Sequence, residues 1–315
     1  MSNLYPPEGR LLHTSDNQAA CASLPALLAA MDRETVLEGR AVLCTPSHDL
    51  SVRLGPFTGI IPREEAALGI REGTAREIAI LSRVGKPVAV TVTRQDEEGR
   101  LILSRRRAQE RVLDRLAAQP PGTVLPAVIT HLAGFGAFAD VGCGVISMVG
   151  IENCSVSRIS HPSCRFSPEQ DIFVVLTGVD RKAHRVYLSH KELLGTWEEN
   201  AARFSPGMTV PGIIRGIKEY GAFVELAPNL TGLADRTEGL RENQRVSVYL
   251  KSIQPKAMKV KLNIIGPLED LSGPPPLPYV ITSDRITRWD YSPPDCTRAK
   301  VFRDFSYPCP LTESQ

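Results

Sequence analysis

Short stretches of alternating apolar and polar residues, each bounded by Gly, Pro or Asn, dominate one region of the chain. Four of them follow one another: TVPGIIRGI from Thr209, GAFVELA from Gly221, RVSVYLKSI from Arg245 and KVKLNII from Lys259. Their β-branched content and their length are typical of strands. Four or five such strands within about 70 residues favour a small closed barrel, because closure leaves no free sheet edge.

This pattern is repeated along the chain. The phrase EYGAFVEL at 219–226 has a near copy, GFGAFADV, that begins 85 residues earlier at Gly134. The glycines Gly122 and Gly207, which open the two copies, keep the same offset. RVYLSHKE from Arg185 repeats RLILSRRR, which begins 85 residues before it. A constant period predicts repeated units. We assign three of them, at residues 36–104, 120–190 and 205–265.

The third unit is shorter than the second. It has no counterpart of residues 151–166, which we interpret as a loop insertion between strands of the second unit.

Between the units the spacing of apolar residues changes. They no longer alternate with polar residues, as in a strand, but recur every three to four residues, as in a helix. Residues 105–119 and 191–204 are each predicted to form a linker helix that packs against a neighbouring barrel. Their apolar stripes contain Ala108, Val112, Leu113 and Leu116, and Leu193, Leu194, Trp197, Ala201 and Phe204.

The two ends of the chain differ from the repeats. Residues 1–35 contain one helical stretch, near 22–31. Residues 266–315 form a proline-rich tail, and proline-rich segments are extended. We expect Trp289 and Tyr291 of this tail to fold back onto the third unit as a short strand, and residues 307–315 to be mobile.

The repeated phrase places an aromatic ring and an acid on one face of a strand. Phe223 shares its face with Glu225, and Phe138 shares its face with Asp140, because side chains alternate along a strand. We therefore predict that the face with the ring and the acid is the outer, solvent-exposed face of the barrel. The side chains predicted to face the core are Ala222, Val224, Leu226, Ala137, Ala139 and Val141.

A second ring, Phe135 or Tyr220, precedes each phenylalanine and is followed by a glycine. A glycine in a strand marks a bulge or a close backbone approach, and a bulge would bring both rings onto the outer surface. Two exposed rings form a platform on which bases stack. The alternative is that the rings belong to the barrel core or pack against a linker helix.

Basic residues lie near the rings in the sequence. Lys259 and Lys261 alternate with apolar residues and face outward, and Lys251 ends the preceding strand. Cations of this kind position phosphates without reading the base sequence. The remaining candidates for phosphate contact are Arg185, Arg215, Lys218 and His131.

Composition narrows the classes of function. The net charge of +2 does not indicate a strongly basic neutraliser of nucleic acid, so a polyanion would be met by local patches. No apolar stretch approaches the roughly 18 residues of a membrane span.

The seven cysteines contain no C-x-x-C pair and are interpreted as reduced thiols. Cys143, Cys154, His161 and Cys164 could form a zinc site, but their spacing matches no common ligand pattern. No catalytic motif is present, and we predict no enzyme activity, no metal and no cofactor.

With these residues identified, the second and third units resemble the RNA-binding domain named after ribosomal protein S1. The resemblance rests on GFGAF, YGAF, RVYLS and PNLTGL, together with the opening glycines. It implies an all-β fold of three tandem five-stranded OB-fold barrels joined by short linker helices. The whole arrangement resembles the short S1-like proteins of low-GC Gram-positive bacteria.

The resemblance also implies roles for particular positions. The family's outer aromatic residues correspond to Phe135 and Phe138, and to Tyr220 and Phe223. Its late-strand cation corresponds to Arg100, Arg185 and Lys259, and its preceding acid to Asp96 and Asp180.

Some positions depart from the family pattern. Its third-strand histidine is replaced by Gly150 and Asp235. The first unit has CTPSHDLSVRLG from Cys44 in place of the aromatic phrase, so we expect its barrel to fold without a stacking platform and to dock on a ribosome, another protein or the neighbouring barrel.

Two classes of function follow from these observations. In the first, the second and third units bind single-stranded RNA, such as mRNA, in translation. In the second, the protein is an interaction scaffold on the ribosome or the transcription machinery and contacts RNA incidentally. The modest charge favours the scaffold, and the duplicated rings favour RNA binding, which is our prediction. We expect single-stranded RNA and the small ribosomal subunit as partners, a monomer, no membrane association and a cytoplasmic location.

Overall fold

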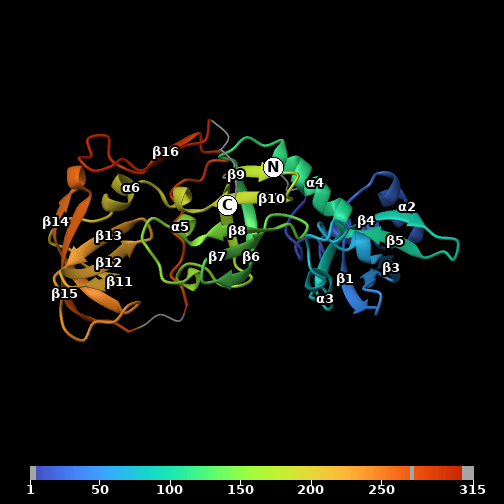
Figure 1. Cartoon of the computed structure of the whole chain (residues 1–315), viewed down its shortest axis with the longest axis horizontal. Helices are drawn as coiled ribbons and strands as arrows, with labels where there is room; N and C mark the ends of the chain where they lie inside the picture. Colours follow the sequence, from blue (N-terminus) through green and yellow to red (C-terminus); the bar gives the residue numbers. More distant parts are fainter. Residues whose placement is uncertain (1–4, 270–272, 307–315) are drawn as a thin grey trace.

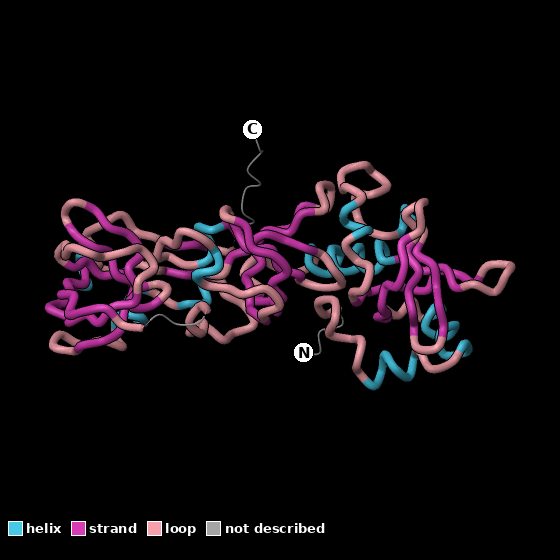
Figure 2. Tube along the Cα trace, turned by 90° about the horizontal axis from the view of Figure 1, so that it is seen from below, coloured by secondary structure: helices cyan, strands magenta, loops and turns pink. Residues whose placement is uncertain are grey.

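The computed structural model describes residues 5–269 and 273–306. Within them, the chain forms three closed five-stranded barrels arranged in a row, from blue at one end to orange at the other (Figure 1). The same three groups of strands are separate when the molecule is seen from below (Figure 2). The predicted fold of three tandem barrels is confirmed. The mobility expected of residues 307–315 lies outside the described ranges.

All three barrels share one topology, in which the strands pair in the cyclic order first, second, third, fifth, fourth and the third and fifth strands run parallel. Barrel one consists of β1 (Leu37–Cys44), β2 (Leu50–Leu54), β3 (Phe57–Ile61), β4 (Pro87–Gln95) and β5 (Leu101–Ser104). Barrel two consists of β6 (Val124–Ala133), β7 (Gly136–Asp140), β8 (Ile146–Gly150), β9 (Asp171–Asp180) and β10 (Arg185–Ser189). Barrel three consists of β11 (Thr209–Lys218), β12 (Gly221–Ala227), β13 (Leu230–Ala234), β14 (Arg245–Gln254) and β15 (Lys259–Pro267).

A long helix, α4 (Arg105–Ala117), connects barrels one and two where the first linker helix was predicted. Ser104 caps it by accepting a hydrogen bond from the backbone N–H of Arg107. The side chains of its predicted stripe are buried within the core cluster of barrel two. The helix therefore contributes to the barrel that follows it.

The segment before barrel one packs on barrel one through its helices, and the residues around Glu8 reach barrel two as well. Its helices are α1 (Ser15–Ala20), which was not predicted, and α2 (Leu24–Asp32), which covers the predicted helical stretch. Upstream of them, the buried carboxylate of Glu8 forms an ion pair with Arg105 at 2.6 Å. Burial raises the pKa of the Glu8 carboxyl, but the Arg105 guanidinium outweighs it and holds that pKa below its usual value.

The second linker is not one helix. It consists of η3 (Lys191–Leu194) and α6 (Trp197–Ala201), separated by Gly195 with φ of 82°. A new cap starts at Thr196, whose side chain forms a capping box with Glu199. The predicted continuous helix is therefore wrong, because the glycine ends one turn and the threonine begins another. Leu193, Leu194, Trp197 and Ala201 are nevertheless buried.

The insertion at residues 151–166 docks on barrel three. It contains α5 (Ile151–Cys154) and η2 (Pro162–Cys164). The backbone N–H of Val156 donates to the side-chain oxygen of Asn229 at 2.9 Å. A buried ion pair joins Arg165 of the insertion to Glu225 of β12. The insertion thus fixes barrel two against barrel three.

The C-terminal tail packs along barrels two and three. Trp289 and Tyr291 are buried in the core cluster of barrel three, where we expected them. Trp289 lies in a short strand, β16 (Arg288–Asp290), and Tyr291 follows it. This strand pairs with β17 (Phe302–Asp304) of the same tail rather than with the barrel. The tail also contacts barrel two, because the backbone N–H of Val124 donates to the Asp284 carbonyl at 2.9 Å. The remaining short elements are η1 (Arg63–Glu65), α3 (Ile78–Leu81) and η4 (Pro255–Ala257).

A buried histidine marks the contact between barrel two and the tail. Nδ1 of His190 lies 2.8 Å from the carbonyl oxygen of Cys154, and Nε2 lies 3.3 Å from the hydroxyl of Tyr279 in the tail. The ring packs edge-on against Phe166 with centroids 4.9 Å apart. Burial lowers the pKa of His190 to about 4, so the imidazole is neutral at pH 7.

This histidine predicts a loss of stability in acid. Its folded pKa, about 4, lies below its unfolded value of 6.5. The native state therefore binds fewer protons between these values, and the free energy of unfolding falls as the pH drops from about 6.5 toward 4. The variant His190→Asn keeps a donor for the Cys154 carbonyl but does not titrate. Chemical denaturation at several pH values is expected to show a steeper acid loss in wild type than in the variant, whereas parallel curves would contradict the assignment.

Candidate nucleic-acid interface

Barrel two presents a pair of aromatic rings on its outer face. Phe135, in the turn before β7, is 61% exposed, and Phe138 of β7 is half-buried beside it. Their ring centroids are 6.0 Å apart and the rings meet edge to face. His131 of β6 lies on the other side of Phe138, with centroids 5.9 Å apart. The three residues form one exposed aromatic surface.

Barrel three repeats this arrangement closely. Tyr220 is 69% exposed, and its ring meets Phe223 edge to face with centroids 6.1 Å apart. The interplanar angle is 88° here and 86° between Phe135 and Phe138. The two copies of the sequence phrase therefore place their rings in the same geometry.

The glycine between the rings allows a close backbone approach. A Cβ atom built at Gly136 would lie 2.7 Å from the carbonyl oxygen of Val149, and one at Gly221 would lie 2.4 Å from that of Ala234. A side chain at either position would push the third strand away from the second. The bulge that we predicted lies instead in the preceding strand, after Ile129 in barrel two and after Ile214 in barrel three.

The rings continue into an apolar row across the sheet that sequence reasoning missed. Phe138 pairs with Met148 of β8, which is 41% exposed. Phe223 pairs with Leu233 of β13, which is 37% exposed and next to Lys261. Alternation along the third strand could have indicated both residues, because each faces opposite to a buried neighbour.

Most of the predicted cations are available on the surface. Lys218, Lys259 and Lys261 are exposed on barrel three, and Lys251 is exposed beside Asp235, with the charged atoms 3.4 Å apart. Arg185 is exposed at the start of β10, but it lines a crevice that is shared with barrel one. Lys218 thus lies on β11, which pairs with the ring-bearing strand β12, whereas Lys251, Lys259 and Lys261 lie on β14 and β15, which do not pair with it.

Arg215 is a correction to the predicted set. Its Nε lies 2.9 Å from a carboxylate oxygen of Glu225, and its Nη1 lies 2.9 Å from the side-chain oxygen of Asn243. The side chain is only 5% exposed. A guanidinium that is neutralised and covered in this way is not available for a phosphate, so we remove Arg215 from the RNA-contacting residues.

The acids that share the ring face are buried, which corrects the prediction of a wet face at their positions. Glu225 is covered by the insertion and neutralised by Arg165 and Arg215. Asp140 is 3% exposed and accepts hydrogen bonds from the backbone N–H groups of Gly142 and Glu8. Burial, reinforced by the neighbouring Glu8 carboxylate, raises the pKa of Asp140 to about 7.

The inward positions of the ring strand follow the prediction with one exception. Leu226 is half-buried, and Ala227 is buried in its place. The cause is a register shift after Glu225, which moves the alternation by one residue.

Barrel one lacks the ring pair, as its sequence predicts. In its first two strands Leu43 pairs with Ser51, after the same bulge that places His131 opposite Phe138. Ser51 therefore occupies the position of the phenylalanine. His48, three residues earlier, lies 3.2 Å from the carboxylate of Glu77.

The structure does not assemble the hypothetical zinc site. Among the described residues, no three His, Cys, Asp or Glu side chains are placed to hold a metal ion. Cys143 and Cys154 are buried in the core cluster of barrel two, and Cys164 contacts Asn243. In the same part of the chain, no helix is long and apolar enough to cross a membrane.

A comparison with known protein families finds a match for barrel two. Residues 119–191 match the family model of the S1 RNA binding domain, and all five strands of barrel two lie within that range. Barrel two is similar to the S1 RNA-binding domain over its whole length. The resemblance that its motifs carried is confirmed. Barrel three shares the strand order and the ring geometry of barrel two.

Curated relatives carry names of ribosomal proteins. The small ribosomal subunit protein bS1 homolog of Bacillus subtilis is 29% identical over 198 residues, covering 57% of this chain and 52% of its own. The small ribosomal subunit protein bS1 of Staphylococcus aureus is 30% identical, covering 57% of this chain and 50% of its own. The chain therefore spans about half the length of these relatives.

One solved structure aligns with a large part of the chain. A multidomain protein with nucleic acid binding domains from Streptococcus pneumoniae aligns over 73% of each chain, with 16% identity and a TM-score of 0.24. This overall similarity is too low to support an inference about function.

Proposed function

We propose that the protein binds single-stranded RNA through the ring pairs of barrels two and three. The observation that carries the proposal is the repetition of one exposed edge-to-face pair, Phe135 with Phe138 and Tyr220 with Phe223. Bases stack on such rings whatever their identity, because every base has a π-face. Unpaired bases reach the rings, whereas the bases of a duplex stack on each other.

The two ring pairs are carried by barrels that are joined to each other. The insertion and the tail join barrels two and three, so the rings are held in a fixed arrangement before RNA arrives. Binding at one barrel then raises the effective concentration of the strand at the other. A fixed arrangement also lowers the entropy lost when the strand binds.

The exposed cations contact phosphates and give no sequence preference. Arg185 of barrel two and Lys218, Lys251, Lys259 and Lys261 of barrel three supply these contacts, and the His131 imidazole adds a hydrogen-bonding group beside Phe138. Contacts to the phosphates hold an RNA strand in register but do not read its bases.

We further propose that the small ribosomal subunit is a partner, as the names of the relatives suggest. Barrel one is the proposed docking domain. It exposes apolar side chains on β1 and on and after α3, namely Val42, Leu43, Ile78, Leu81 and Val84. Exposed apolar patches mark protein contacts. The protein then works in translation, in the cytoplasm and as a monomer, holding mRNA near the ribosome.

A salt titration with single-stranded and duplex RNA tests the proposed function. Fluorescence anisotropy is measured with a labelled, unstructured RNA of about 20 nucleotides, long enough to span two barrels. If these five cations, Arg185 and the four lysines of barrel three, each meet a phosphate, the logarithm of the binding constant falls with the logarithm of salt concentration with a slope of about −3.5. A duplex of the same length is expected to bind much more weakly. Equal binding of both forms would contradict stacking and would favour the scaffold function.

A further inference from the structure

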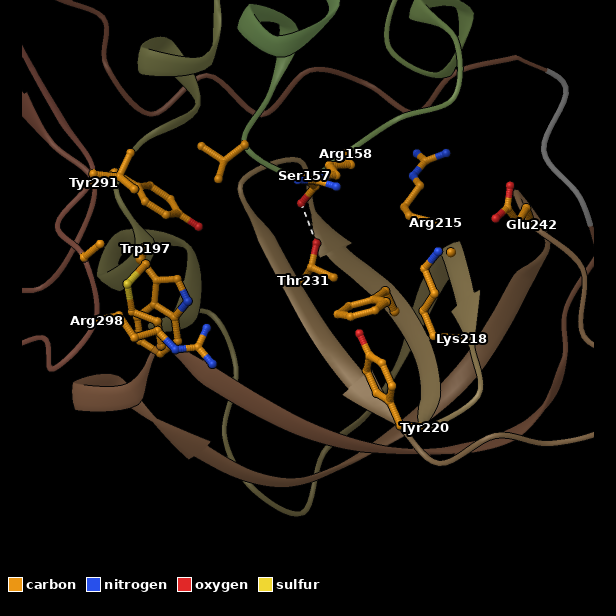
Figure 3. A pocket seen from close by; sticks show the side chains of 16 residues that line it. Ser157, Arg158, Trp197, Arg215, Lys218, Tyr220, Thr231, Glu242, Tyr291 and Arg298 are labelled. Atoms are coloured by element: carbon orange, nitrogen blue, oxygen red, sulfur yellow. Dashed lines mark hydrogen bonds between the residues drawn. The ribbon is translucent and has the colours of Figure 1, made fainter.

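A pocket of about 730 Å³ lies directly beside the ring pair of barrel three. Three parts of the chain that are distant in the sequence form its walls (Figure 3). Barrel three contributes Lys218, Tyr220 and Phe223, and the insertion of barrel two contributes Ser157 and Arg158. The tail closes the opposite side with Tyr291 and Arg298.

The walls combine the groups that a nucleotide needs. The Tyr220 and Phe223 rings supply an aromatic surface for a base. Arg158, Lys218 and Arg298 are exposed at the rim and belong to the three different parts of the chain. Figure 3 shows Lys218 and Tyr220 on one side of the space and Arg298 on the other. Charge-assisted contacts from several directions suit a phosphate.

The floor of the pocket carries polar groups between the rings and the tail. The hydroxyls of Ser157 and Thr231 are 2.7 Å apart and bonded to each other. Glu242 also lines the space and can accept a hydrogen bond from an amino group of a base. Ligand pockets of about 300–1,000 Å³ combine an apolar wall with a few polar groups of this kind.

We propose that this pocket holds one unstacked nucleotide of the bound strand. Its base stacks against the Tyr220 and Phe223 rings. The phosphates on its two sides face the cations of the two walls, Lys218 and Arg158 on one side and Arg298 on the other. The proposal rests on the proposed function, and it adds that barrel three does not bind RNA alone. Barrel two's insertion and the C-terminal tail complete its site.

A charge-matched pair of variants in the tail tests the pocket. Arg298→Ala removes a cation that lines the pocket, and Lys300→Ala removes an exposed cation two residues away that does not line it. Both changes lower the net charge by one. Anisotropy with the same unstructured RNA is run across a salt series on the full-length chain. A variant in the opposite wall, Arg158→Ala, is measured beside them.

The expected result separates the effect of a direct contact to a phosphate from the effect of a lower net charge. Arg298→Ala and Arg158→Ala should each weaken binding by about fivefold and reduce the salt slope by about 0.7, the value for one lost phosphate contact on a single strand. Lys300→Ala should change affinity by less than about twofold and leave the slope unchanged. If wild type binds RNA and all three variants behave alike, the pocket proposal is wrong and the proposed function stands. If wild type does not bind, both are wrong.

Discussion

Replacing Glu225 with alanine is expected to destabilise barrel three and its contact with barrel two by about 3–5 kcal/mol, because removing one member of a buried ion-pair network leaves uncompensated charge. Arg165 reaches Glu225 from the insertion with its Nη1 2.9 Å from a carboxylate oxygen, and Arg215 reaches it from β11 with its Nε at the same distance. The side chains of Arg165 and Arg215 are 1% and 5% exposed. Alanine at position 225 would leave both guanidinium groups buried without a carboxylate.

Tryptophan fluorescence during urea denaturation is the measurement for this variant. Trp197 and Trp289 are the two tryptophans of the chain, and both lie in the core cluster of barrel three. Glu219→Ala is the matched control, because Glu219 is an exposed acid of the same barrel and its loss should change stability by about 0.5 kcal/mol or less. An unfolding midpoint for Glu225→Ala equal to that of Glu219→Ala would show that the ion pairs do not hold the two barrels together.

The double variant Phe138→Ala, Phe223→Ala is expected to lose most of the affinity for single-stranded RNA. Each base stacked on an aromatic ring contributes about 1–3 kcal/mol, which corresponds to about 5- to 150-fold in affinity for each phenylalanine removed. The two rings lie on barrels that are held together, so the single variants weaken binding at one end of a two-site surface. The two rings are on different barrels and do not touch each other, so their losses should add in free energy. The loss of the double variant should then be about the product of the two single losses.

The control for this experiment is another exposed ring of barrel three. Tyr249 of β14 is 38% exposed and belongs to neither ring pair. Tyr249→Ala should therefore bind RNA within about twofold of wild type, since isolated surface substitutions have small effects. Circular dichroism of each variant establishes that it is folded. A folded double variant that binds as well as wild type would assign the rings to packing or to a protein partner.

The fold and the ring pairs could be predicted from the sequence because their signals are local and repeated. Alternation identified the strands, and an offset of 85 residues between Gly122 and Gly207 identified the repeat. The outward position of Phe138 and Phe223 follows from their place on a strand, which is set by the residues on either side. Phe135 and Tyr220 lie in the turn that precedes that strand. The absence of rings from barrel one followed from Ser51 and His48 in the same way.

The burial of the acids Glu225 and Asp140 could not be predicted from the alternation of side chains along their strands. Alternation places Glu225 and Asp140 on the outer face, but it says nothing about what covers that face. Arg165 lies 60 residues before Glu225, and Glu8 lies 132 residues before Asp140. Both acids are buried by segments outside their own strands. Arg215 pairs with the buried Glu225, so its charge is neutralised, although the sequence pattern had predicted an exposed side chain. Only the tertiary structure brings these residues together.

The pocket beside Tyr220 escaped prediction for the same reason. Arg158 and Arg298 are charged residues in irregular segments, where no periodicity assigns them a face. They line one pocket only because the insertion and the tail meet over barrel three.

Photo-crosslinking of the full-length chain to an unstructured RNA that carries 4-thiouridine tests the central claim most directly. After digestion, mass spectrometry identifies the peptides that are joined to RNA. The proposed function predicts adducts in two regions, at residues 131–148 of barrel two and at residues 218–233 of barrel three, and loss of both in the Phe138→Ala, Phe223→Ala variant. Adducts confined to barrel one, or an unchanged pattern in that variant, would contradict the claim that the two ring pairs are the RNA-binding surface.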